Sequence, residues 1–188
     1  IEAVSYAQAI GELTKQYRTI TISGSHGKST TTALCALVLE EGYCDPTVIL
    51  GTKLNEFGGS NFRSGKGRYL VLEADEWNKS FLNYHPEIAL VTNIDAEHLD
   101  TYGTIESVEK TFQEYLERVP RLGKIIANED NERLHGVAKK FGMNVIWYSL
   151  KHPEAALVRS VLRIPGEHNV SNALAALHLG RYLGVTQA

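Results

Sequence analysis

Short apolar segments alternate with helical patterns along the chain, and this alternation restricts the possible folds more than any other feature of the sequence. The segments are rich in Val and Ile, and most lack the apolar–polar alternation of a half-exposed strand. Strands that are buried on both faces have this composition. We therefore predict strands at residues 19–22, 47–50, 69–72, 88–91, 124–127, 144–147 and 161–164.

Helices are predicted between these strands from apolar residues at helical spacing. Residues 30–41 are apolar nearly all round, which indicates a central, buried helix. The other predicted helices begin after Ser5 as a helix cap, follow the stripes 108–119 and 134–141, and occupy the end of the chain up to about Gly184. Strands that alternate with helices predict an α/β fold, in which a mostly parallel sheet carries helices on both faces.

A glycine-rich loop gives the strongest functional signal. It follows the first predicted strand and opens the central helix, with Gly24 and Gly27 before Lys28 and Ser29. Glycines allow the backbone to approach an anion closely, and the start of a helix attracts that anion. In such loops the lysine reaches the terminal phosphates, and the hydroxyl is a ligand of Mg²⁺. The sheet is therefore predicted to be of the P-loop type. The residues expected to bind the nucleotide here are Gly24, Ser25, His26, Gly27, Lys28, Ser29 and Thr30.

The loop departs from the general phosphate-loop pattern. The usual spacing of four residues between the glycines would require glycine at position 22, where Ile22 stands. The alternative interpretation is a glycine-rich turn with an incidental lysine. Strand, loop and buried helix in succession favour the phosphate loop.

Acidic and histidine clusters follow the next two parallel strands. Glu73 begins a run of three carboxylates after residues 69–72, and His98 lies in a polar segment after residues 88–91. Parallel sheets place ligands at the carboxyl ends of their strands, and Mg²⁺ prefers oxygen ligands. The alternative for the acidic run is a solvated turn, and a lone histidine is often structural.

Two further segments leave alternatives open. Asn169 and Asn172, at the start of the last helix, are predicted on a face away from its apolar stripe, where carboxamides suit a purine edge. The competing interpretation is helix capping by Asn169. Residues 57–67 contain four glycines among polar residues and are predicted as either a plain surface loop or a substrate loop.

Composition excludes several classes of protein. Nineteen basic and 22 acidic residues give a net charge of −3, which argues against a general nucleic-acid or membrane-surface binder. No apolar run approaches the roughly 18 residues of a membrane span. Two cysteines, Cys35 and Cys44, form neither a disulfide framework nor a four-ligand zinc site, so a cytoplasmic setting is expected. The two ends of the chain suggest a single domain, residues 1–188, excised from a longer protein.

These segments, in this order, resemble the central ATP-binding domain of the Mur ligase family of peptidoglycan synthesis. Within the family they are most similar to the branch that adds L-alanine to UDP-N-acetylmuramate. The resemblance implies an ATP-dependent amide ligase that works through an acyl phosphate. It also implies that Lys28 binds the β- and γ-phosphates. The residues implied for Mg²⁺ are Ser29, Glu73 and His98, and those implied for adenine are Asn169 and Asn172.

Two departures from the family pattern stand out. Several branches carry a carbamylated lysine about fifteen positions after the metal-site histidine, where this chain has Phe112 and Gln113. This difference favours the alanine-adding branch. Family members also have a longer segment with extra strands between Tyr148 and Pro165, so here the segment is either naturally short or incomplete.

Three other functions remain open from the sequence. They are a ligase for recycled muropeptide, a folylpolyglutamate-type ligase, and a nucleotide-binding regulatory domain without catalysis. The expected partners of an intact enzyme are UDP-N-acetylmuramate and an amino acid, with neither nucleic acid nor a membrane.

Overall fold

A seven-stranded sheet runs through the molecule, with the strand order β3-β2-β4-β1-β5-β6-β7. The computed structural model describes residues 3–185. The strands are β1 (Arg18–Ser23), β2 (Thr47–Leu54), β3 (Ser60–Arg63), β4 (Tyr69–Glu73), β5 (Ile88–Val91), β6 (Lys124–Asn128) and β7 (Val145–Tyr148). Only β2 and β3 pair antiparallel among the described strands. The predicted α/β class with a mostly parallel sheet is confirmed.

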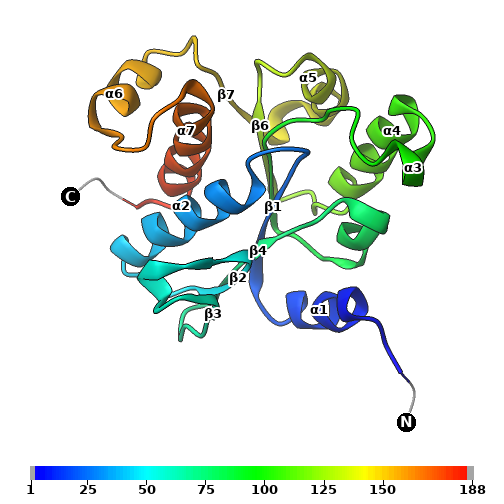
Figure 1. The fold of residues 1–188 in the computed structure, drawn as a ribbon, viewed down its shortest axis with the longest axis horizontal. Helices are drawn as coiled ribbons and strands as arrows, with labels where there is room; N and C mark the ends of the chain where they lie inside the picture. Colours follow the sequence, from blue (N-terminus) through cyan, green and yellow to red (C-terminus); the bar gives the residue numbers. More distant parts are fainter. Residues whose placement is uncertain (1–2, 186–188) are drawn as a thin grey trace.

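Helices cover both faces of the sheet, which Figure 1 shows almost edge-on. One face carries α2 (Lys28–Glu41), α6 (Glu154–Val161) and α7 (Glu167–Tyr182). The opposite face carries α1 (Tyr6–Thr14), α3 (Leu99–Tyr102), α4 (Ile105–Leu116) and α5 (Glu132–Ala138). Three 3₁₀ segments complete the chain: η1 (Asn55–Phe57), η2 (Trp77–Asn83) and η3 (Lys139–Asn144).

Each face of the sheet has its own hydrophobic core. On one side, α2 packs against α7 and buries Cys35, Ala36 and Leu39 completely. On the other side, the Phe81 ring stacks on Tyr115 with centroids 4.4 Å apart. The Tyr115 hydroxyl shares a hydrogen bond with Thr21 of β1, so this buried polar group is satisfied. The central strands β1, β4, β5 and β6 are buried nearly throughout, as their composition predicts.

The prediction of a strand at residues 161–164 is wrong. Val161 is the last residue of α6, and the chain continues through Leu162 without entering the sheet. Ala155 and Val158 are buried three residues apart on one side of this helix. The apolar residues of this helix therefore follow a helical period. At its C-terminal end they resemble a short β-type run.

The stretch 57–67 is more ordered than a loop. It contains β3, which pairs antiparallel with β2 and places Phe62 opposite Ile49. Two residues of β3 are exposed and the other two half-buried, so this edge strand lacks the apolar run by which the buried strands were recognised. Both interpretations of 57–67 as a loop were therefore incomplete.

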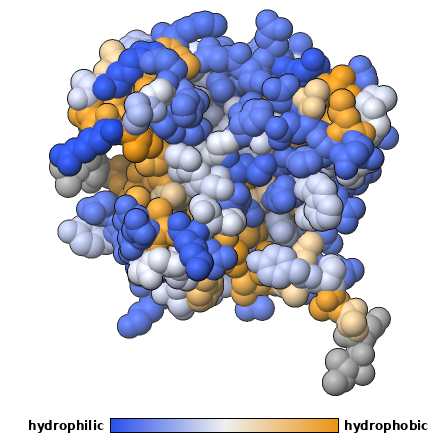
Figure 2. Space-filling view, in the orientation of Figure 1, coloured by the Kyte–Doolittle hydropathy of each residue, from blue (hydrophilic) through white to orange (hydrophobic). Residues whose placement is uncertain are grey.

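The surface is mostly polar on the face that Figure 2 shows. Hydrophobic areas on this view include one over α6, where Leu157 and Val161 are exposed. Among the described residues, no helix combines the length and the apolar character that crossing a bilayer requires.

Replacing Leu39 by Ala should test the central place of α2. Leu39 is fully buried between α2 and the sheet, so its truncation should lower the free energy of unfolding by about 3 kcal/mol. The matched control is Leu122→Ala, because Leu122 is 90% exposed. Chemical denaturation of both variants checks the prediction, and equal losses of stability would contradict the observed packing.

Candidate functional site

The carboxyl ends of three adjacent strands form the candidate site. β1 pairs in parallel with β4 on one side and β5 on the other, so the segments that follow these strands share one edge of the sheet. The glycine-rich loop follows β1, Glu73 ends β4, and His98 lies beyond β5. The structure thus brings the loop, Glu73 and His98 to one edge, as their positions after strands predict.

The loop between β1 and α2 has a backbone that requires glycine. Gly24 has φ +134° and Gly27 has φ +81°. A Cβ at Gly24 would overlap the Thr92 hydroxyl, and one at Gly27 would lie 2.7 Å from Asn172 Oδ1. The loop is therefore pressed between the end of β5 and helix α7.

The start of α2 offers free donors beside this loop. No side chain caps the helix, whose first residue is Lys28. The first amides of a helix lack partners within it and attract anions. A cavity of about 350 Å³, lined by residues 25–30, lies at this helix start. An anion such as phosphate fits this arrangement.

Lys28 is held on three sides. Its Nζ donates hydrogen bonds to the carbonyl oxygens of Gly24 at 2.7 Å and Ser25 at 3.3 Å. It also donates to Glu76 Oε1 at 3.0 Å and lies 2.9 Å from Oε2. The Glu76 side chain is only 2% exposed. Burial raises the pKa of Glu76 above its ordinary value, while Lys28 acts in the opposite direction.

Glu73 contacts the loop through Ser29. The Ser29 hydroxyl donates to Glu73 Oε1 at 2.8 Å, and the Gly51 amide donates to Oε2 at 2.7 Å. Both carboxylate oxygens are therefore engaged, and the side chain is fixed toward the start of α2. A hydroxyl and a carboxylate in contact are the oxygen ligands that Mg²⁺ binds beside phosphates.

His98 lies beside Glu76, a carboxylate that was not assigned to Mg²⁺ from the sequence. Its Nε2 lies 3.7 Å from Glu76 Oε1, and these two residues with Glu97 offer ligand atoms within 4.8 Å of one another. Glu76 Oε2 is buried without a hydrogen bond. This oxygen faces the Lys28 ammonium at 2.9 Å, and the oxygen-rich donor set fits a divalent cation.

His26 is exposed on the loop and faces two acids. Its Nε2 lies 3.8 Å from Asp95 and its Nδ1 3.5 Å from Glu97. The His26 amide donates to Asn93 Oδ1 at 2.8 Å, and its carbonyl accepts from Thr92 Oγ1 at 2.6 Å. These contacts join the glycine-rich loop to the segment after β5.

Asn172 packs on the loop, and Asn169 lies one turn before it on α7. Asn172 is 6% exposed and sits against Gly27, so its face of α7 is buried as well as the predicted apolar stripe. The contact of these two residues with adenine stays a prediction. Asn169 does not cap the helix, since the N-cap is Gly166 and Asn169 donates to Pro165 O at 2.7 Å.

Several residues of the site were not assigned from sequence. Glu76 and Glu97 lie within the acidic clusters, but nothing in the sequence shows that they turn toward Lys28 and His98. Thr92 and Asn93 directly follow β5, which is the one signal that could have identified them.

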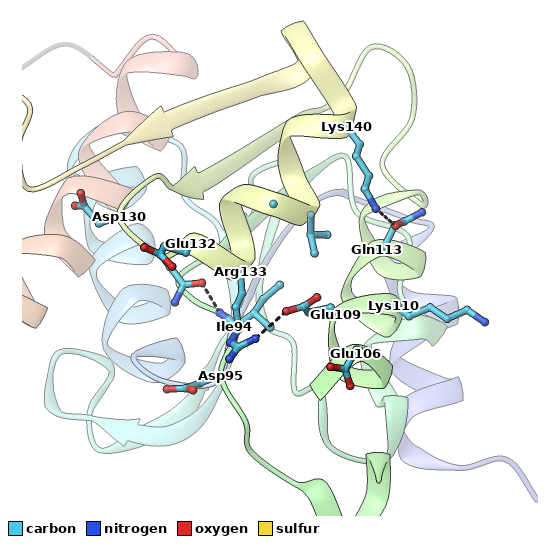
Figure 3. A pocket seen from close by; sticks show the side chains of 13 residues that line it. Ile94, Asp95, Glu106, Glu109, Lys110, Gln113, Asp130, Glu132, Arg133 and Lys140 are labelled. Atoms are coloured by element: carbon cyan, nitrogen blue, oxygen red, sulfur yellow. Dashed lines mark hydrogen bonds and ion pairs between the residues drawn. The ribbon is translucent and has the colours of Figure 1, made fainter. Parts of the chain in front are cut away.

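A larger cavity of about 770 Å³ lies between α4 and α5. Figure 3 shows its charged lining, where Arg133 pairs with Glu109 at 3.1 Å and Lys140 donates to Gln113 at 2.6 Å. None of the residues predicted for the site lines it. Five carboxylates line this cavity against three basic side chains, and Asn131 caps the start of α5, so the cavity offers an anion less than the uncapped start of α2 does.

Comparisons with known proteins show which family the chain resembles. A family model described as the Mur ligase middle domain matches residues 22–163. The chain is 37% identical over 202 residues to UDP-N-acetylmuramate–L-alanine ligase of Pelotomaculum thermopropionicum, covering 95% of this chain and 44% of that protein. The chain thus spans less than half the length of this curated relative.

Two solved structures share the fold. The UDP-N-acetylmuramate:L-alanyl-γ-D-glutamyl-meso-diaminopimelate ligase from Neisseria meningitides matches with a TM-score of 0.81 and 21% identity, over 97% of this chain and 67% of that one. The UDP-N-acetylmuramate-alanine ligase from Thermotoga maritima matches with a TM-score of 0.76 and 25% identity, over 95% of this chain and 44% of that one.

Replacing Gly24 by Ala should distort the loop. The new methyl group meets Thr92 at a backbone angle that alanine disfavours, so the free energy of unfolding should fall by about 3 kcal/mol. Gly58→Ala is the control, because Gly58 also has a positive φ but no atom within 4 Å of its Cβ position. That variant should lose about 1 kcal/mol in the same denaturation experiment. Equal losses would show that the contact with Thr92 is unimportant.

Proposed function

This chain belongs to the Mur ligase family, whose middle domain it matches, and we propose that it is the ATP-binding part of a ligase that joins L-alanine to UDP-N-acetylmuramate. The observation that carries the proposal is the uncapped start of α2, with Lys28 over the loop and Ser29 against Glu73. The 37% identity to an enzyme of that name supports the choice of substrates.

The proposed reaction has two steps. The carboxylate of the muramyl substrate attacks the γ-phosphorus of ATP, which gives an acyl phosphate and releases ADP. The amine of the amino acid then attacks the acyl carbon and expels inorganic phosphate. Neither step needs a covalent protein nucleophile, so the work of this chain is positioning and charge stabilisation.

Residues of the loop have distinct tasks in this scheme. The amides at the start of α2 orient the phosphates, and the Lys28 ammonium stabilises negative charge on the β- and γ-phosphates. Ser29 and Glu73 would hold Mg²⁺, with His98 on the other side of the site. When bound, Mg²⁺ neutralises charge on the phosphate oxygens.

Adenine is proposed to bind beside the start of α7. Asn172 contacts the loop at Gly27, and its Nδ2 lies 3.5 Å from Asn169 Oδ1. The two carboxamides therefore form a pair next to the phosphate site. Carboxamides supply both donors and acceptors, which a purine edge requires.

The other substrates are proposed to bind outside these residues. The chain covers 44% of the relative that carries the ligase name, so we assign it a single domain, residues 1–188, of a longer enzyme. Residues 1, 2 and 186–188 of that domain lie outside the described residues. The chain alone is then expected to bind nucleotide without forming the amide.

Lys28→Ala should weaken binding of Mg-ATP to this chain by about 100-fold, because the variant loses a charge-assisted contact to the phosphates. Isothermal titration calorimetry measures the affinity. Lys110→Ala is the control, since Lys110 is a 79%-exposed lysine that lines the larger cavity. Unchanged affinity in Lys28→Ala, or a loss confined to Lys110→Ala, would refute the assignment of the site.

Asn172→Leu should separate base binding from phosphate binding. The variant should bind Mg-ATP about tenfold more weakly, while its affinity for inorganic triphosphate stays nearly unchanged. The reason is that, of the two ligands, only ATP carries the adenine proposed to contact the carboxamide. Calorimetry with the two ligands makes the comparison, and equal weakening of both would indicate a structural role for Asn172 in the loop.

A further inference from the structure

The edge of the sheet that carries the phosphate loop is rich in negative charge. The described contacts there place one ammonium group, that of Lys28, among several carboxylates. Those carboxylates belong to Glu73, Asp75, Glu76, Asp95 and Glu97. A nucleoside triphosphate that binds at this edge adds further negative charge, and the nearby carboxylates repel it.

The one ammonium group is already neutralised. All three protons of Lys28 have acceptors, two on loop carbonyls and one on Glu76. Only 16% of the Lys28 side chain and 2% of the Glu76 side chain are exposed. An ion pair so far from water is held strongly, and separating it leaves a buried charge without a partner.

Glu76 nevertheless has a second position for a cation. Its Oε1 lies 3.7 Å from His98 Nε2, and its buried Oε2, which has no hydrogen bond, faces the Lys28 ammonium at 2.9 Å. Glu97 completes a group whose ligand atoms lie within 4.8 Å of one another. A divalent cation at this group would replace Lys28 as the partner of the Glu76 carboxylate.

We propose that Glu76 is a specificity-determining residue, which retains Lys28 until a nucleotide arrives together with a divalent cation. A metal-free nucleotide can recruit Lys28 only by leaving Glu76 buried and unpaired. A metal-loaded nucleotide brings the compensating charge. The loop therefore binds the metal-loaded nucleotide more tightly because of Glu76. This effect adds to any direct contact of Ser29 and Glu73 with the metal. This inference rests on the proposed nucleotide site.

The test compares nucleotide affinity with and without metal. Calorimetry measures the binding of ADP in excess Mg²⁺ and in excess EDTA to the wild-type chain and to Glu76→Gln. Glutamine keeps the shape of the side chain and removes its charge. The variant should bind metal-free ADP about tenfold more tightly than wild type, so its preference for the Mg²⁺ form should fall by a similar factor.

Asp75→Asn is the matched control for charge. Asp75 is the exposed neighbour of Glu76, and its carboxylate accepts a hydrogen bond from the Trp77 amide without contacting Lys28. Its preference for the Mg²⁺ form should stay within about twofold of wild type, because exposed charges are screened. An equal change in both variants, or no change in Glu76→Gln, would overturn the proposal.

Two further results separate the possible failures. If Glu76→Gln does not fold by thermal unfolding, Lys28→Met is compared with Lys28→Met/Glu76→Gln, which removes both buried charges. Without Lys28 this comparison tests the pairing of Glu76 with the arriving cation: the double variant should show a smaller preference for the Mg²⁺ form than Lys28→Met, and equal preferences would overturn the proposal. Failure of the wild-type chain to bind ADP in either medium would contradict the proposed function itself.

Discussion

The parallel pairing of β1 with both β4 and β5 is the constraint on which the candidate site depends. It places three strand ends side by side, so residues 24, 73 and 98, far apart in sequence, share one edge of the sheet. The core supports this arrangement from both faces, with α2 packed under α7 and the Phe81–Tyr115 stack on the other side. Since β1 is central, the loop that follows it begins from a rigid base.

Electrostatics at this edge combine attraction and restraint. The start of α2 attracts anions through its free amides, whereas the surrounding carboxylates oppose them. Lys28 belongs to both effects, because it lies over the loop and pairs with buried Glu76. The positive charge of Lys28 is thus neutralised before a ligand arrives. The ligand that suits this site best carries both phosphates and a cation.

Sequence patterns predicted most of the sheet and the place of the loop, because buried strands and glycine-rich turns depend on local chemistry. Six predicted strands correspond to β1, β2, β4, β5, β6 and β7. Edge strand β3 was not predicted because it is half-exposed and lacks an apolar run. A strand was predicted at residues 161–164 because the apolar residues at the end of α6 and just after it form a short run. The Lys28–Glu76 pair and the burial of Asn172 depend on how separate elements pack, which no local pattern contains.

The central claim is that the loop after β1, and not the larger cavity between α4 and α5, receives the phosphates. Amide chemical shifts of the isotope-labelled chain, recorded by NMR during titration with Mg-ADP, test it directly. The account predicts that the largest changes fall on Gly27, Lys28 and Ser29. Changes centred instead on Glu109, Arg133 and their neighbours in the larger cavity would contradict it.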